Sequence, residues 1–385
     1  MVGEKTKTSK ILSIAFLAII FGMLIIGIFL PDKKSSSEEN RSLQTLPAFS
    51  ISEYLDGRFE NKIEDYVNDQ FPARNEFIKV KAAADQTIGI LESNGVIQAK
   101  NGFLMENLTT PDSKNLEETE QAIADFAKRH SKLKMSFMLV PNAANTLSDY
   151  LPATVTMADQ NKQMDEFFAN MKEDRVTPID VRAAFNKAKD DINLYYRTDH
   201  HWTSDGAYLA YQTVIRKLTG DKAKTYAPVV VKTDFRGTLA SKSGFTNGAD
   251  DVIKIYQPAE RSSYKKSVIY YSDTQKKTTN FYQLKNLKKK DAYTVFGGSN
   301  HPMYTIDTAN TNQKRLLLIK DSYANSMIPF LTQHYREIVV VDPRYYFENL
   351  EDLIESEKIT DVLFLYNANT FFADDSLKIM LSDTE

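Results

Sequence analysis

The sequence contains no cysteine among its 385 residues. Disulfide frameworks, cysteine-ligated zinc, iron–sulfur clusters and thiol catalysis are therefore excluded, and a nucleophile has to be sought among other side chains. A strong net charge is also missing, because 48 basic side chains face 51 acidic ones and the formal charge is −3. This balance argues against a protein whose main task is to bind nucleic-acid phosphate, so no nucleic-acid partner is expected.

The rest of the composition is that of an ordinary folded protein. Hydrophobic residues make up 42% of the chain and charged residues 26%, which excludes disorder or a fibrous repeat for most of it. A length of 385 residues predicts about two folded units.

Only one apolar run is long enough to cross a membrane. Residues 11–30 carry no charge and are interrupted only by Ser13, Gly22 and Gly27. At ~1.5 Å per residue this helix would span ~30 Å, the thickness of a bilayer core. The run ends at Pro31 without a small-residue cleavage pattern, which favours an uncleaved anchor over a signal peptide. We therefore expect a cytoplasmic tail over residues 1–10, a single-pass anchor over 11–30, a polar linker over 31–50 and an extracellular domain over 51–385.

The exterior part shows the periodicities of alternating helices and strands. Apolar residues at helical spacing predict two helices between Ile51 and Leu91, separated by a break at Phe71-Pro72. An Asn-Gly turn between two apolar runs predicts a hairpin from Gly95 to Met105. Further helices are predicted at about 115–129 and 160–172, and strands at 134–140, 176–181, 316–319, 338–341 and 362–366.

Such alternation predicts an α/β fold with a mostly parallel sheet and helices on both faces. The stretch at about 229–296 differs, because it is rich in Tyr, Thr and Lys and contains alternating segments such as SVIYYS and TNFYQL. We expect a β-rich insertion there.

The first group of chemically capable residues is the segment Thr198-Asp199-His200-His201-Trp202, just before an amphipathic helix. Thr203 or Ser204 is a suitable N-cap for that helix. In an extended backbone Asp199 and His201 project to one side and His200 to the other, so the carboxylate can orient the His201 imidazole. Adjacent histidines facing apart would not share a metal ion, and we expect no metal site. The Asp199–His201 pair is a general-base arrangement that lacks a nucleophile.

The second group of chemically capable residues supplies a candidate nucleophile, Ser322. The strand Leu316 to Ile319 ends in Lys320-Asp321-Ser322 and continues into sequence that can begin a helix. Ser322 would be exposed at the carboxyl edge of the sheet, where the N–H groups of Ser322 and Tyr323 could hold an oxyanion. A serine at this place can also be a simple N-cap, but together with Asp199 and His201 the position favours a nucleophile.

Two other residues are candidate substrate contacts. Arg344 follows the strand 338–341 at the same sheet edge and could grip a sugar or a carboxylate, or pack at the surface. Trp202, the single tryptophan, could support the loop from the core or stack on a sugar.

The motifs TDHHW, IKDSYANSMIPFL and VDPRYYF together resemble the bacterial DHHW protein family. More distantly, the chain resembles the SGNH-hydrolase-like acetyltransferases of alginate O-acetylation. The segment from Asp69 (DQFPAR) through the hairpin Gly102-Phe103-Leu104 also resembles the start of those proteins. The resemblance implies an SGNH-hydrolase-like fold with Ser322 as nucleophile, His201 as base and Asp199 as orienting carboxylate. It also implies that Asn367, at the end of a later strand, is an oxyanion donor, although a turn residue would look the same. Lys320 departs from the related motif, which has glycine.

Three hypotheses follow. The first is a membrane-anchored extracellular O-acetyltransferase that modifies a polysaccharide hydroxyl of the cell envelope or of an exopolysaccharide. The resemblance implies a membrane-bound O-acyltransferase as its acyl-donor partner, and no cofactor. The second is a carbohydrate O-acetylesterase with the same triad, and the third is an envelope scaffold without activity.

Overall fold

The computed structural model describes residues 2–36, 41–246, 249–259 and 266–382. Parts of three predicted regions lie outside the described residues: 37–40 of the linker, 247–248 and 260–265 of the β-rich stretch, and the chain ends at 1 and 383–385. The chain divides into two compact units, residues 1–94 with 241–246, and residues 95–240 with 247–385.

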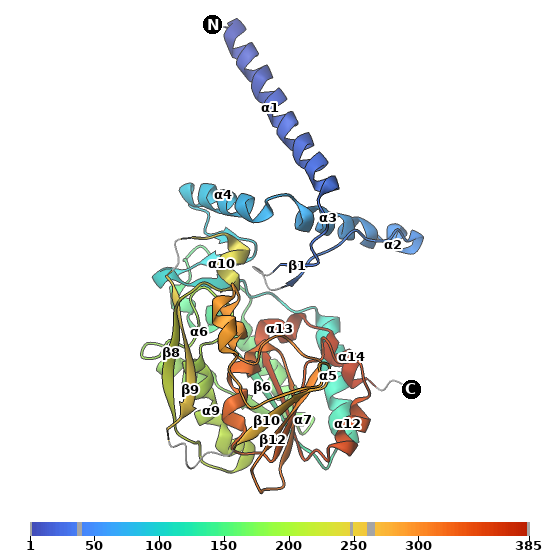
Figure 1. Ribbon diagram of the computed structural model, residues 1–385, viewed down its shortest axis with the longest axis vertical. Helices are drawn as coiled ribbons and strands as arrows, with labels where there is room; N and C mark the ends of the chain where they lie inside the picture. Colours follow the sequence, from blue (N-terminus) through green and yellow to red (C-terminus); the bar gives the residue numbers. More distant parts are fainter. Residues whose placement is uncertain (1, 37–40, 247–248, 260–265, 383–385) are drawn as a thin grey trace. The chain divides into compact units, whose positions relative to one another are not determined.

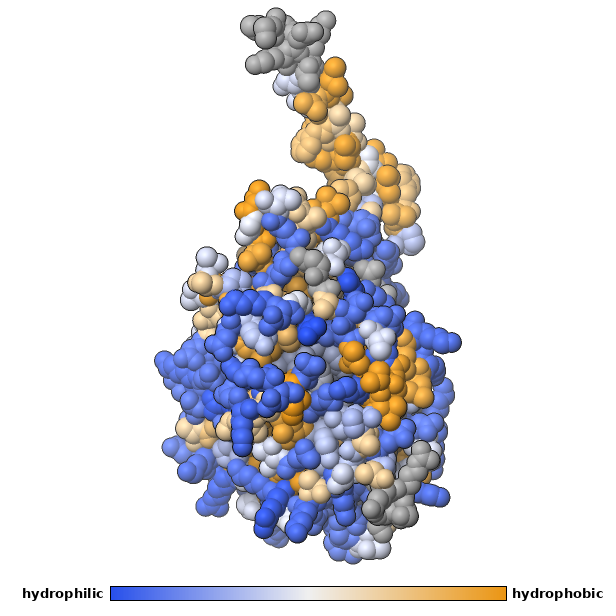
Figure 2. All heavy atoms as spheres, turned by 90° about the vertical axis from the view of Figure 1, so that its left-hand side faces the viewer, coloured by the Kyte–Doolittle hydropathy of each residue, from blue (hydrophilic) through white to orange (hydrophobic). Residues whose placement is uncertain are grey.

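Among the described residues, the main part of the first unit consists of α1, further helices and short strands. α1 (Val2–Phe29) contains one stretch, Ser9–Gly27, that is long and apolar enough to cross a membrane, and none of it is buried in the protein. Figure 2 shows the hydrophobic surface along this helix. The predicted tail is therefore a continuation of the same helix, and the predicted linker contains β1 (Ser35–Ser36) and β2 (Arg41–Ser42).

The two helices predicted between Ile51 and Leu91 are present, and the break at Phe71-Pro72 separates α3 (Arg58–Gln70) from α4 (Arg74–Thr87). The first of them is divided once more, because Gly57 has φ 77° and separates α2 (Ile51–Leu55) from α3. A short strand, β3 (Glu92–Ser93), ends the main part of this unit.

The second unit is built on an eight-stranded sheet in the order β11-β10-β12-β14-β13-β15-β6-β7. β6, β10 and β12 of this sheet are labelled in Figure 1. Neighbouring pairs from β14 to β7 are parallel, and β12, β10 and β11 extend that edge in antiparallel fashion. The strands are β6 (Lys134–Val140), β7 (Thr177–Asp180), β10 (Ser267–Tyr271), β11 (Lys276–Thr278), β12 (Met303–Thr308), β13 (Arg315–Lys320), β14 (Glu337–Val341) and β15 (Asp361–Asn367). The predicted mostly parallel α/β sheet is confirmed.

Apolar layers cover both faces of this sheet, because alternate residues of each strand point to opposite sides. In β6, Met138 and Val140 belong to one buried cluster, whereas Phe137 and Leu139 belong to the other. The first cluster includes residues of α8 (Arg182–Ala188), α9 (Ser204–Thr219) and α11 (Ile328–Leu331). The second includes residues of α5 (Ser113–Arg129), α7 (Gln160–Glu173), α12 (Leu350–Ser356), α13 (Ala368–Ala373) and α14 (Ser376–Leu381).

The Tyr- and Lys-rich stretch contributes to two sheets. β8 (Tyr226–Phe235) and β9 (Asp251–Pro258) form a separate antiparallel pair, but the SVIYYS segment is β10 and joins the main sheet. TNFYQL does not form a strand along its length, since β11 ends at Thr278 and the 3-10 helix η4 (Leu284–Lys288) follows. The next turn, η5 (Ala292–Val295), is held against η4 by a hydrogen bond from Asn286 Nδ2 to the Thr294 carbonyl, 3.0 Å.

The predicted hairpin is also present. β4 (Val96–Gln98) and β5 (Leu104–Glu106) pair in antiparallel fashion, and the turn between them is η1 (Lys100–Gly102), in which Asn101 has φ 57°. Asparagine and glycine tolerate this left-handed conformation better than other residues, which explains the Asn-Gly signal.

Candidate active site

The loop with Asp199 and His201 is held closed ahead of α9. Tyr195 and Trp202 form an isolated antiparallel bridge, and the Tyr196 N–H donates to the His201 carbonyl, 3.2 Å. Thr203 is the N-cap of α9, as predicted, and its hydroxyl accepts from the Gly206 N–H at 3.1 Å. The loop is thus fixed by its own backbone and by the start of the helix.

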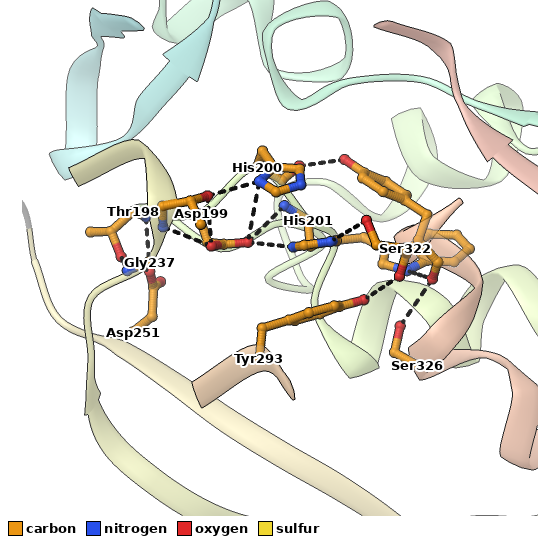
Figure 3. A network of polar contacts seen from close by, with 12 residues as sticks. Thr198, Asp199, His200, His201, Gly237, Asp251, Tyr293, Ser322 and Ser326 are labelled. Atoms are coloured by element: carbon orange, nitrogen blue, oxygen red, sulfur yellow. Dashed lines mark hydrogen bonds and ion pairs between the residues drawn. The ribbon is translucent and has the colours of Figure 1, made fainter. Parts of the chain in front are cut away.

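Asp199, His201 and Ser322 form one chain of hydrogen bonds (Figure 3). His201 Nδ1 lies 2.6 Å from Asp199 Oδ1, and His201 Nε2 lies 2.8 Å from Ser322 Oγ. Asp199 and His201 are buried, whereas Ser322 is partly exposed. The structure therefore brings together the three residues that the sequence selected, although 121 positions separate His201 from Ser322.

The second carboxylate oxygen of Asp199 is held from α10 (Thr238–Ser243). Thr238 donates to Oδ2 from its backbone N–H at 2.9 Å and from its hydroxyl at 3.0 Å. Burial alone would raise the pKa of Asp199, but the attraction of His201 and His200 and these hydrogen bonds outweigh it. The pKa lies well below its usual range, and Asp199 is a carboxylate at neutral pH.

The backbone just before Asp199 is also fixed, and a glycine from another segment lies against the Asp199 side chain. The buried Asp251 accepts from the Arg197 and Thr198 N–H groups, both at 2.8 Å. Gly237 approaches so closely that a Cβ placed on it would overlap the Asp199 side chain. Only glycine fits at position 237 without displacing the carboxylate.

The ring of His201 is packed between two other rings. Tyr293, from η5, stacks on it with a centroid distance of 3.6 Å and an interplanar angle of 9°. The His200 ring lies on the opposite side, 3.8 Å away and tilted by 36° (Figure 3). Burial, followed by the repulsion of a charge on His200, lowers the pKa of His201 to about 4 against the opposing influence of Asp199. The imidazole is therefore neutral at pH 7 and able to accept a proton.

The expectation that His200 faces away from His201 is wrong. The segment is a series of bends and not an extended strand, so the two rings come to the same region. Donor atoms of Asp199, His200 and His201 lie within 4.8 Å of one another, which a metal site also requires. Here, however, Asp199 and His201 bind each other and His200 Nδ1 bonds to the Thr238 hydroxyl, 2.8 Å, so hydrogen bonds account for the cluster.

Ser322 begins the 3-10 helix η6 (Ser322–Ser326) at the carboxyl end of β13. Asp321, directly before it, accepts from the Tyr323 N–H at 2.9 Å and from the Asn367 N–H at 2.8 Å. The expectation that the Tyr323 N–H holds an oxyanion is therefore wrong, because the Asp321 side chain already occupies this donor. Burial raises the pKa of Asp321 to about 6, against the opposing influence of the Asn367 N–H and of Arg344.

Asn367 lies on the neighbouring strand at the level of Ser322, since Lys320 of β13 is in register with Leu365 of β15. Its Oδ1 accepts from Asn142 Nδ2 at 3.1 Å and from the Thr370 N–H at 3.3 Å. Its Nδ2 is buried and has no hydrogen-bond partner among the described residues. A buried amide donor without a partner costs stability unless something binds to it, which is typical of a site that meets its acceptor in the reaction.

Arg344 follows β14, the strand that pairs with β13 ahead of Ser322. Its Nε and Nη2 donate to the two oxygens of Asp342 at 2.8 and 2.7 Å, and Lys320 reaches the same carboxylate at 3.2 Å. Lys320 is the residue that stands in place of the glycine of the related motif. It is buried, and its ammonium group is paired with Asp342. The Arg344 side chain remains 31% exposed.

Trp202 is fully buried, and its Nε1 donates to the Tyr323 carbonyl at 2.8 Å. A ring without exposed surface offers no face to a sugar, so the expectation that Trp202 contacts substrate is wrong and the core alternative holds. Its hydrogen bond ties the histidine loop to the serine turn.

Sequence reasoning missed Tyr293, Gly237 and Thr238. All three come from the stretch interpreted only as a β-rich insertion, in or next to short helices that this interpretation did not predict. Their roles arise from long-range contacts, which leave no local signal.

The fold is SGNH-hydrolase-like, and a serine, a histidine and an aspartate meet at the carboxyl edge of its mostly parallel sheet. Residues 96–283 match the family described as "SGNH hydrolase-like domain, acetyltransferase AlgX". The matched part includes Asp199 and His201 but ends before Ser322. The resemblance that the sequence motifs indicated is thus confirmed.

Individual proteins are similar to this chain as well. The chain is 23% identical over 226 residues to the probable alginate O-acetylase AlgJ of Pseudomonas aeruginosa, covering 57% of this chain and 54% of that protein. It therefore spans about half the length of this curated relative. A DHHW family protein from Eubacterium siraeum has the same fold, with a TM-score of 0.63 and 24% identity over 75% of this chain and 95% of that one. Bacillus cereus PatB1, solved with a sulfonyl adduct, has a TM-score of 0.60 and 22% identity over 74% and 97% of the two chains.

Proposed function

We propose that this chain is a membrane-anchored extracellular O-acetyltransferase that acetylates a hydroxyl group of a cell-envelope or secreted polysaccharide. The hydrogen-bonded chain from Ser322 through His201 to Asp199 is the observation that carries this proposal. The similarity to a protein named as a probable alginate O-acetylase supports the acyl group and the class of acceptor.

In the first half-reaction Ser322 Oγ attacks the carbonyl carbon of an acetyl donor. His201 Nε2, 2.8 Å away, takes the hydroxyl proton, and Asp199 stabilises the imidazolium that forms. The leaving group departs with the proton from His201, and an acetyl ester remains on Ser322. The neutral imidazole at pH 7 is the form that this step requires.

The tetrahedral intermediate carries a negative oxygen that needs hydrogen-bond donors. We assign Asn367 Nδ2 to this role because it is buried and lacks a partner among the described residues. The backbone N–H of Ser322, at the start of η6, is the natural second donor. Tyr323 is excluded from the role because its N–H is bound to Asp321.

In the second half-reaction a polysaccharide hydroxyl gives its proton to His201 Nε2, and its oxygen attacks the acetyl carbon. The bond between the acetyl carbon and Ser322 Oγ breaks, and the proton passes from His201 to Ser322 Oγ, which restores the serine. Arg344, partly exposed at the same sheet edge, is our candidate contact for an acidic or hydroxyl group of the acceptor. Acetyl-CoA is cytosolic, so the acetyl group must be carried across the membrane. We propose a membrane-bound O-acyltransferase as the partner that supplies it. The apolar helix α1 would keep this chain close to that partner.

The test uses the purified protein and an activated acetyl ester. Mass spectrometry should show one added acetyl group on Ser322 in the wild type and none in Ser322→Ala, whereas a scaffold would acquire none. Candidate oligosaccharides are then added. Acetylated sugar identifies a transferase, and free acetate released equally with and without sugar identifies an esterase and contradicts the proposal.

A further inference from the structure

Exposed apolar side chains are unevenly distributed outside α1. Among the described residues, eleven large ones lie between residues 31 and 94 and only eight in the much longer second unit. The eleven are Leu46, Phe49, Ile51, Tyr54, Leu55, Val67, Phe77, Val80, Ile88, Ile90 and Leu91. Where exposed apolar side chains are contiguous on a folded protein, they mark a place of interaction.

The most regular part of this surface follows α4. Phe77, Val80, Ala84, Ile88 and Leu91 recur at intervals of three and four residues, so they form one stripe along the helix and the turn after it. In a core helix such a stripe would be buried, but Val80 is 66% and Ile88 74% exposed. The periodicity that predicted this helix therefore belongs to a face that lies outside the core of its own unit.

The end of α3, the helix before α4, is tied to the segment that follows the apolar helix. Lys33, four residues after Phe29, exchanges two hydrogen bonds with Gln70: its N–H donates at 2.9 Å and its carbonyl accepts at 3.0 Å. Tyr66 donates to Asp32 at 3.2 Å. Since α4 begins at Arg74, only a few residues beyond Gln70, its first turn lies close to the point where the chain would leave the bilayer.

We infer that the α4 stripe is a lipid-binding surface that lies in the interface of the membrane crossed by α1. The inference rests on the proposed anchoring. An amphipathic helix fixed beside a membrane exit can bury its apolar face at the boundary of headgroups and acyl chains. Tyr54 and other exposed side chains of α2 (Ile51, Leu55) belong to the same unit and have the composition found at such boundaries.

The absence of native cysteine makes a direct test possible, because one introduced cysteine takes one spin label. The full chain is reconstituted into phosphatidylcholine–phosphatidylglycerol vesicles with a label at Val80→Cys or Ile88→Cys. Lys79→Cys, on the opposite side of the same helix, is the matched control, and Ile20→Cys reports on α1. Collision rates with apolar oxygen and with a water-soluble nickel chelate measure the depth of each label, and circular dichroism shows that each variant is folded.

We expect the ratio of oxygen to nickel collisions at positions 80 and 88 to exceed that at position 79 severalfold. Equal ratios at the three positions, with the label at position 20 in the bilayer, would overturn the inference and leave the anchoring intact. Stripe labels that are immobilised and protected from both reagents would overturn it too, since protein would then cover the stripe. A label at position 20 in water would overturn the anchoring and the inference together.

Discussion

The ring of Tyr293 lies parallel to the imidazole of His201, 3.6 Å away and inclined by 9°. The Tyr293 hydroxyl donates to the carbonyl of Ser322 at 3.1 Å. One side chain thus contacts both the proposed base and the backbone of the proposed nucleophile. Because an aromatic face attracts a cation, this ring also favours the imidazolium that forms during the reaction.

Tyr293→Leu should therefore slow acetylation of Ser322 more than Tyr293→Phe does. The phenylalanine variant keeps the stacked ring and loses one hydrogen bond, whereas leucine loses the ring, and a desolvated cation–π contact of ~2 kcal/mol corresponds to roughly thirtyfold in rate. Single-turnover acetylation with an activated ester, measured with thermal stability, tests this. A leucine variant as fast as the wild type would show that the stack has no part in positioning His201.

The pKa of His201, lowered to about 4 by burial and by His200, predicts the acid limb of the reaction. The base is active when neutral, so activity should be lost as the pH falls through about 4 and should vary little between pH 5.5 and 7.5. His200→Gln removes a positive neighbour that opposes protonation of His201, and the midpoint should move to higher pH. Profiles of kcat/KM against pH check both statements. A midpoint near 6.5 that does not respond to the substitution would contradict them.

Asn367→Ala should lower kcat by about 10²–10³, the usual effect of removing one oxyanion donor. Asn369→Ala is the matched control, since Asn369 is in the same polar network but its Nδ2 is bound to the Asn107 carbonyl at 3.2 Å. Steady-state kinetics with an acetyl ester separates the two. An equal, small loss in both variants would leave Asn367 as a cap of α13 and nothing more.

Gly237→Ala should displace the Asp199 carboxylate, because the new Cβ would overlap it. We expect loss of most activity and a destabilisation of about 1–3 kcal/mol, typical of forcing an atom into a packed site. Thr238→Ser keeps both donors to Asp199 and should remain close to the wild type. Denaturant unfolding and acetylation rates measure the two effects, and an alanine variant with normal values for both would refute this account of Gly237.

The sequence predicted those parts of the site whose signals are local. β6 has the predicted bounds because the apolar run from Lys134 to Val140 is closed by Pro141. Ser322 follows a strand and Thr203 caps a helix, so both could be placed at the ends of their elements, and the structure brings their loops together. The predictions that failed depend on side-chain competition: Asp321 occupies the Tyr323 N–H, and bends at residues 198–201 turn His200 toward His201.

The parallel strands of the main sheet could also be predicted from the sequence. Its antiparallel edge, where β10 pairs with β12, could not. Runs of aliphatic residues such as Ile338 to Val341 identify buried parallel strands, because both faces are covered. The alternating segment SVIYYS has the pattern of a strand without information about its neighbours. Only the long-range pairing of β10 with β12 places it in the main sheet.

The central claim is that Ser322 is a nucleophile activated by His201. The most direct measurement is peptide mass spectrometry of the wild type, Ser322→Ala and His201→Ala after brief exposure to an activated acetyl ester. We expect one acetyl group on the peptide that contains Ser322 in the wild type, none in Ser322→Ala and acetylation at least 10³-fold slower in His201→Ala. Acetylation of the wild type at other side chains only, or at an equal rate in the His201 variant, would contradict the account.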